Sequence, residues 1–155
     1  MKWLAILAAL TGPAAAQSVG PCGEWAAAEN IAEPWEDNTD TFANGAVRVA
    51  LLDVGEPALA AEHLLILSPP FDLRQMRRCR VVSAVVAPEG GWPSGFFRMD
   101  FAGRKASYDP ATGLKLVIPV ALPEDSTDGV VADGFSRTLT VTIPMNSDIS
   151  ARLVP

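Results

Sequence analysis

The sequence predicts an all-β protein: a single-domain antiparallel β-sandwich or small barrel of about seven to nine short strands. Three observations lead to this prediction. From residue 42 onward, apolar residues alternate with polar ones at a period of two. Glycine and proline, 12 and 13 of the 155 residues, fall between these alternating runs and end them. Hydrophobic residues make up 49% of the chain and charged residues 19%, so extensive disorder is excluded.

Residues 1–16 have the layout of a secretory signal peptide. A lysine at the second position precedes an apolar run at 3–10, and three alanines at 14–16 supply a small-residue cleavage site. A buried N-terminal helix is the less favoured interpretation. The apolar run is too short to anchor the chain permanently in a bilayer. We therefore expect cleavage after residue 16, one β-rich domain over 17–155, and no stable membrane span.

The mature chain contains two cysteines, Cys22 and Cys79. An even number of cysteines in an exported protein favours a disulfide, which here closes a loop worth about 4 kcal/mol in the chain-entropy model. Two separate thiols or a redox pair are the alternatives, but redox pairs usually lie close together in sequence. Nine of the 12 basic residues are arginine and alanine is abundant, as in GC-rich bacterial genomes. The expected location is therefore the periplasm or the medium.

The expected elements follow in chain order. Residues 24–33 form the one candidate helix, because Trp25 shares a stripe with two alanines. The alternation begins in a strand at 47–51, whose three apolar residues point one way. The run 63–68 is nearly all apolar, as in a strand buried on both faces. Further strands are expected at 80–87, 97–101, 105–108, 114–120, 138–143 and 149–154, with a hairpin loop at 109–113.

Composition and motifs narrow the classes of function. The net charge of −6 argues against a general nucleic-acid binder. One histidine and two cysteines leave little material for a zinc site. The chain contains neither a phosphate-cradling glycine loop nor a metal-ligand signature, so we expect no cofactor and no metal. We assign no catalytic residue.

Five residues are candidate contacts for a ligand or partner: Arg74, Arg77, Arg78, Arg80 and Trp92. The arginines form the one basic cluster of an acidic chain, and guanidinium groups bind oxyanions through paired hydrogen bonds. Internal pairing with acidic residues is the favoured alternative for them. The tryptophan stands in an exposed Gly/Pro loop, although tryptophans more often close the ends of a sandwich core. The expected partner is an unknown envelope protein or a small anionic ligand.

A small secreted hydrolase is the alternative function. It would use His63, the only histidine, or a pair of carboxylates. No nucleophile-elbow motif accompanies the histidine, so a strand-end residue without a catalytic role is the favoured interpretation. If it is catalytic, it must lie in a cleft beside a hydroxyl and an acid. The acidic loop 124–133 is a weaker candidate for calcium, because its spacing does not match a known calcium loop.

Overall fold

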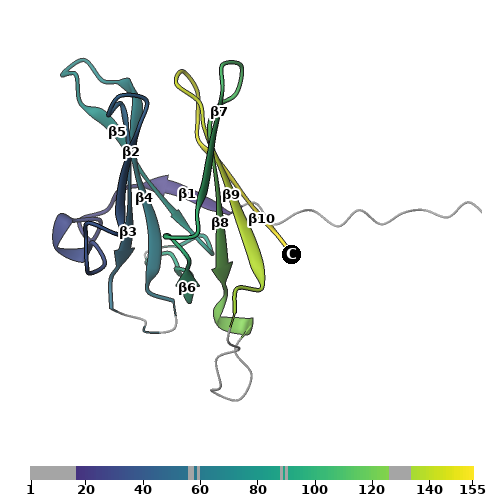
Figure 1. Cartoon of the computed structure of the whole chain (residues 1–155). Coiled ribbons are helices and arrows are strands. Elements are labelled where there is room, and N and C mark those ends of the chain that lie inside the picture. Colours follow the sequence, from purple (N-terminus) through teal and green to yellow (C-terminus); the bar gives the residue numbers. More distant parts are fainter. Residues whose placement is uncertain (1–16, 56–57, 59, 88, 90, 126–133) are drawn as a thin grey trace, which may run out of the picture.

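Two antiparallel β-sheets lie face to face in the protein (Figure 1). The computed structural model describes residues 17–55, 58, 60–87, 89, 91–125 and 134–155. The predicted signal peptide at 1–16 lies outside this part of the chain. The described residues contain ten strands, two 3-10 turns and no α-helix. The predicted all-β sandwich is confirmed.

Sheet I has the strand order β1-β5-β4-β3-β2, and every neighbouring pair is antiparallel. Three of its strands, β3, β4 and β5, are consecutive in the chain and form its centre, while the four-residue strands β1 and β2 close its two edges. The strands of sheet I are β1 (Ser18–Pro21), β2 (Thr39–Phe42), β3 (Val47–Asp53), β4 (Glu62–Phe71) and β5 (Arg77–Ser83).

Sheet II has the order β10-β9-β8-β6. On the same edge of β8, β6 pairs with the last residues of the strand and β7 pairs with its first half. The sheet is built from the second half of the chain, as the green and yellow ribbons of Figure 1 show. The strands of sheet II are β6 (Arg98–Met99), β7 (Lys105–Asp109), β8 (Gly113–Ala121), β9 (Arg137–Ile143) and β10 (Ser150–Val154), with the 3-10 turn η2 (Pro123–Asp125) after β8.

The core fills the space between the sheets with residues at alternate strand positions. In β8 the inward residues are 4% exposed or less, as their spacing predicts, and the same holds for the three apolar residues of β9. The predicted strand at 47–51 likewise turns its valines and Leu51 inward. The largest inward residues are Phe96, Phe101, Leu64, Ile66, Leu116, Ile118, Leu139 and Ile143.

The structure has ten strands where about seven to nine were expected. The additional ones are short edge segments whose sequences do not alternate, SVGP in β1 and TDTF in β2. They are strands because a long neighbour, β5 or β3, offers them unpaired backbone groups. In contrast, the strand expected at 97–101 is reduced to two residues, because the Phe101 amide turns back to the Met99 carbonyl.

The helix expected over residues 24–33 is absent, and only the 3-10 turn η1 (Ala28–Asn30) forms there. The backbone of this segment bonds to the sheet instead. The Ala32 amide donates to the Leu51 carbonyl. Ile31 forms a bridge with Leu52 of β3, next to the N-terminal end of β2. We call residues 22–38 the cover segment, because it crosses the outer face of sheet I. Tertiary pairing here overrides the helical pattern of the sequence.

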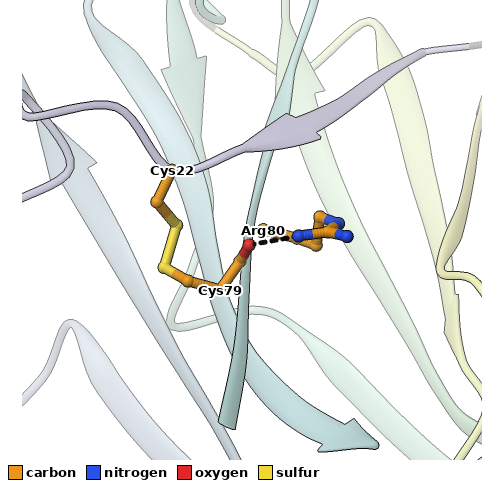
Figure 2. Close-up of a disulfide and its surroundings, with 3 residues drawn as sticks. All are labelled: Cys22, Cys79 and Arg80. Atoms are coloured by element: carbon orange, nitrogen blue, oxygen red, sulfur yellow. Dashed lines mark hydrogen bonds between the residues drawn. A yellow bond between two sulfur atoms is a disulfide. The ribbon is translucent and has the colours of Figure 1, made fainter. Parts of the chain in front are cut away.

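The predicted disulfide between Cys22 and Cys79 is confirmed (Figure 2). Cys79 is in β5 and Cys22 follows β1, so the bond fastens the start of the cover segment to the sheet beneath it. Figure 2 shows the sulfur of Cys79 on one side of β5 and the side chain of Arg80 on the other. A disulfide fits a protein that matures in an oxidising compartment.

The predicted hairpin at 105–120 is also confirmed, as β7 and β8. Its loop is closed by the carboxylate of Asp109, which accepts hydrogen bonds from the amides of Ala111 and Thr112. Gly113 then begins β8 with φ +93°, a conformation that side-chain-bearing residues rarely adopt. A Cβ at this position would lie 2.4 Å from the Ile143 carbonyl oxygen, so both the backbone angle and the packing require glycine.

Candidate binding surfaces

The tip of the β4–β5 hairpin is the most exposed apolar feature of the described chain. It projects at the upper end of sheet I in Figure 1. We define the tip as residues 71–77. Leu73 is fully exposed, and Phe71 and Met76 are 45% and 55% exposed. Exposed apolar side chains that gather on one loop, in contrast to single scattered ones, mark interaction sites.

Hydrogen bonds within the tip hold its backbone in one conformation. The Asp72 carboxylate accepts from the amides of Arg74 and Met76, at 2.8 Å each. The Asp72 amide donates to the Met76 carbonyl, and the Gln75 amide donates to the Asp72 carbonyl. Gln75 adopts φ +61°, a left-handed conformation that costs energy for a residue with a side chain. The loop therefore presents its apolar side chains from a preorganised backbone.

The structure separates the four candidate arginines. Arg74 is exposed at the tip, and its guanidinium forms none of the ion pairs among the described residues. Arg77 lies at the base of the tip and donates to the carbonyls of Gly45 and Ala46 in the β2–β3 turn. Its guanidinium also lies 5.8 Å from the centre of the Phe71 ring. Arg77 thus supports the tip from below.

Arg78 and Arg80 turn the other way. They alternate with Cys79 along β5 and share the face of sheet I that looks toward sheet II. Arg78 donates to Asp148 and to the carbonyls of Ser147 and Pro69, so it joins the two sheets at one end. Arg80 donates to the Cys79 carbonyl. For Arg78, the internal pairing favoured from the sequence is what the structure contains.

Trp92 lies on the outer side of sheet I and stacks on Trp25 of the cover segment, with ring centres 6.1 Å apart. Trp25 in turn lies against His63, with ring centres 4.8 Å apart. Trp92 remains 64% exposed, which agrees with the loop interpretation and not with the favoured one, a tryptophan that closes the end of the core. The two stacked tryptophan rings therefore cover His63 on the outer face of sheet I.

His63 is buried and neutral. It is 2% exposed, and its Nδ1 lies 2.8 Å from the Ser83 hydroxyl oxygen on the neighbouring strand. Burial lowers the pKa of His63 to about 4. The main chain of Gly95 approaches its other nitrogen so closely that a Cβ there would lie 2.8 Å from Nε2. Both ring nitrogens are therefore enclosed, and among the described residues no carboxylate bonds to either.

Glu62 is a titrating group that sequence reasoning missed. Its side chain lies on the opposite strand face from His63, and its Oε2 accepts a hydrogen bond from the Met99 amide. Burial raises the pKa of Glu62 to about 7, and the charge of Asp53, its cross-strand partner, acts in the same direction. The hydrogen bond and the charge of Arg98 oppose the shift. No sequence motif marks this carboxyl, because its environment is created by the second sheet.

In the described part of the acidic loop, Asp125 bonds to neighbouring residues of the same chain. Asp125 accepts hydrogen bonds from the Ser136 hydroxyl at 2.5 Å, the Leu122 amide and the Arg137 guanidinium. These bonds, that of Ser136 foremost, lower the pKa of Asp125. Residues 126–133, which carry the other two aspartates, lie outside the described part of the chain. Within the described residues, no three acidic, histidine or cysteine side chains gather into a metal-binding group.

Comparison with protein-family models, curated proteins and solved structures gave no match. None of the described residues belongs to a helix long and apolar enough to cross a membrane. The function must therefore be inferred from the surfaces that this chain presents.

Proposed function

We propose that this protein is an exported, non-catalytic binding domain of the bacterial cell envelope, periplasmic or secreted, that holds a protein partner through the β4–β5 tip. The observation that carries the proposal is the fully exposed Leu73 at the end of a hairpin whose backbone is bonded internally. An exposed side chain on a rigid loop binds with little loss of conformational entropy. The predicted signal peptide and the disulfide support export.

The apolar and charged side chains of the tip indicate what kind of surface the partner must offer. Leu73 and Met76 require an apolar recess, and Arg74 beside them favours an acidic rim. The tip amides of Arg74, Gln75 and Met76 have acceptors within the loop, so they lose no hydrogen bond when a partner displaces water. These properties suit a tip that inserts into a recess.

The hydrolase alternative has less support. His63 has the required hydroxyl, that of Ser83, but both side chains are enclosed and Glu62 points away from them. General-base catalysis needs a substrate atom within hydrogen-bonding reach of the base. Trp25 and the Gly95 main chain occupy the positions from which a substrate would approach.

The proposal is tested by placing a photoreactive amino acid at position 73 of the tagged protein in its own envelope. We expect one dominant adduct, identified by mass spectrometry. Position 35 serves as the matched control, because Trp35 is 58% exposed and apolar but lies in the cover segment. The same adducts from both positions, or none from position 73, would contradict the proposal.

Two further variants connect the adduct to the tip. With the photoreactive residue at position 73, Met76→Ser and Arg74→Glu should each reduce capture by about tenfold or more, as expected for anchor residues. Neither side chain stabilises the fold, so the melting temperature should not change. Charge reversal at Arg78 and Arg80, which the sequence alone suggests as a test, is unsuitable because Arg78 joins the two sheets.

A further inference from the structure

The outer face of sheet I is apolar but only partly covered. The sequence predicts that the strand at 63–68 is buried on both faces, and the structure contradicts this for part of its length. His63 lies beneath Trp25 and is 2% exposed, whereas Leu65 and Leu67, on the same outer face, are only half-buried. The cover segment leaves both leucines partly exposed. An outer sheet face that meets water normally carries polar residues, so these leucines require an explanation.

Leu65 and Leu67 form the floor of a hollow of about 330 Å³. Ala50 completes the floor, because it is the cross-strand partner of Leu65. Ile31 of the cover segment forms one wall, and Arg48, the cross-strand partner of Leu67, stands at the rim. The volume is at the small end of the range of ligand pockets, roughly 300–1,000 Å³. The floor contains aliphatic side chains and no aromatic ring, which suits a flexible hydrocarbon chain.

The charges at the rim favour an anionic ligand. Asp40 also lines the hollow, but its carboxylate pairs with Arg104 at 2.5 Å. Arg48 is exposed and takes part in none of the three ion pairs of the described residues. The one uncompensated charge at this rim, in the part of the chain that the structure describes, is therefore positive, although the chain carries a net charge of −6.

We propose that this hollow binds a free alkyl carboxylate, with the hydrocarbon chain on Ala50, Leu65 and Leu67 and the carboxylate paired with Arg48. A guanidinium binds a carboxylate through two parallel hydrogen bonds, which gives the site a preference for the acid over a neutral alcohol. Each buried methylene should tighten binding about fourfold. None of the tip residues lines this hollow, so the inference does not rest on the proposed function.

The test measures binding of decanoate, below its aggregation concentration, to the full mature protein by amide chemical shifts in NMR. We expect shifts that centre on Ala50, Leu65 and Leu67, with decanoate binding about fourfold tighter than a chain one methylene shorter. Decanol should bind at least tenfold more weakly. Equal binding of decanol, shifts centred elsewhere, or no binding of decanoate would each overturn the proposal. Binding to anionic lipid vesicles without binding of decanoate would also overturn it.

Two variants and a control separate recognition from folding. Arg48→Glu should abolish decanoate binding, and Leu67→Asp should do the same by placing a charge on the floor. Arg152→Glu makes the same charge change at an exposed position of β10 and should bind as the unmodified protein does. If Leu67→Asp does not fold, Arg48→Glu decides the question, because its exposed side chain bonds to no other described residue. Retained binding by a folded Arg48→Glu variant overturns the proposal.

Discussion

Glu62→Gln should change how the stability of this protein depends on pH. The substitution keeps an acceptor for the Met99 amide but cannot ionise. In the folded protein, burial raises the pKa of Glu62 from 4.5 to about 7. The folded state therefore holds this proton more tightly than the unfolded state. The free energy of unfolding must fall as the pH rises from about 4.5 to about 7, and the loss is complete above that range.

The magnitude follows from the pKa interval. At about 1.4 kcal/mol per unit, the interval corresponds to roughly 3 kcal/mol for a fully shielded carboxyl. Glu62 is only partly buried, so solvent screening reduces this value, and we expect about 1.5 kcal/mol. The Glu62→Gln variant should therefore gain about 1.5 kcal/mol relative to the unmodified protein between pH 4.5 and pH 8.

His63 produces a change of opposite sign in an overlapping range. Its pKa falls from 6.5 to about 4 on folding, so the unfolded state binds the proton more tightly. Stability thus rises with pH between about 4 and 6.5 and is fully present above 6.5. The two contributions oppose each other in the unmodified protein. Without Glu62, the rise caused by His63 should become visible.

The assay is urea unfolding followed by tryptophan fluorescence at a series of pH values from 4.5 to 8. Glu36→Gln is the matched control, because it removes an exposed carboxylate and should leave the shape of the pH profile unchanged. The comparison uses the difference between the Glu62→Gln profile and that of the unmodified protein, in which the titrating groups that do not interact with Glu62 cancel. Parallel profiles over the whole range would refute the reasoning.

Three further variants probe the framework. Replacing Cys22 and Cys79 by alanine should lower the free energy of unfolding by about 4 kcal/mol, measured by urea denaturation, because the bond closes a long loop of the unfolded chain; an unchanged midpoint would contradict this. Arg78→Ala should cost about 1–3 kcal/mol and lower the melting temperature, because the carbonyl of buried Pro69 loses a charged donor and the bond to Ser147 across the sheets is lost; a shift below one degree would be inconsistent. Gly113→Ala should cost at least about 1 kcal/mol in calorimetry, because of its positive φ and the nearby Ile143 carbonyl; a stabilised variant would show that the turn relaxes.

The sequence predicted those parts of the fold that local periodicity determines. Strands β8 and β9 alternate so regularly that their inward residues could be named in advance, and all of them are buried. The disulfide followed from the cysteine count alone. In these cases the residue type and its neighbours in the chain were sufficient.

Other features depend on contacts between distant segments, and local pattern could not reveal them. Strand β1 exists only because β5 pairs with it, and residues 24–33 lose their helix to bonds with β3. The direction of Arg78 follows from the register of β5, which no motif specifies. Glu62 acquires its shifted pKa from burial beneath an element that lies more than thirty residues farther along the chain.

The disulfide between Cys22 and Cys79 can form only if Cys79 of β5 faces outward, which depends on the register of β5 on β4. Cys79 stands between two arginines that face the other way, so a slip of one residue would turn its thiol inward and place both guanidinium groups outside. In the slipped chain Cys22 would find no partner on its side of the sheet. A chain with this one-residue slip cannot form the disulfide, so two free thiols would distinguish it chemically from the native protein.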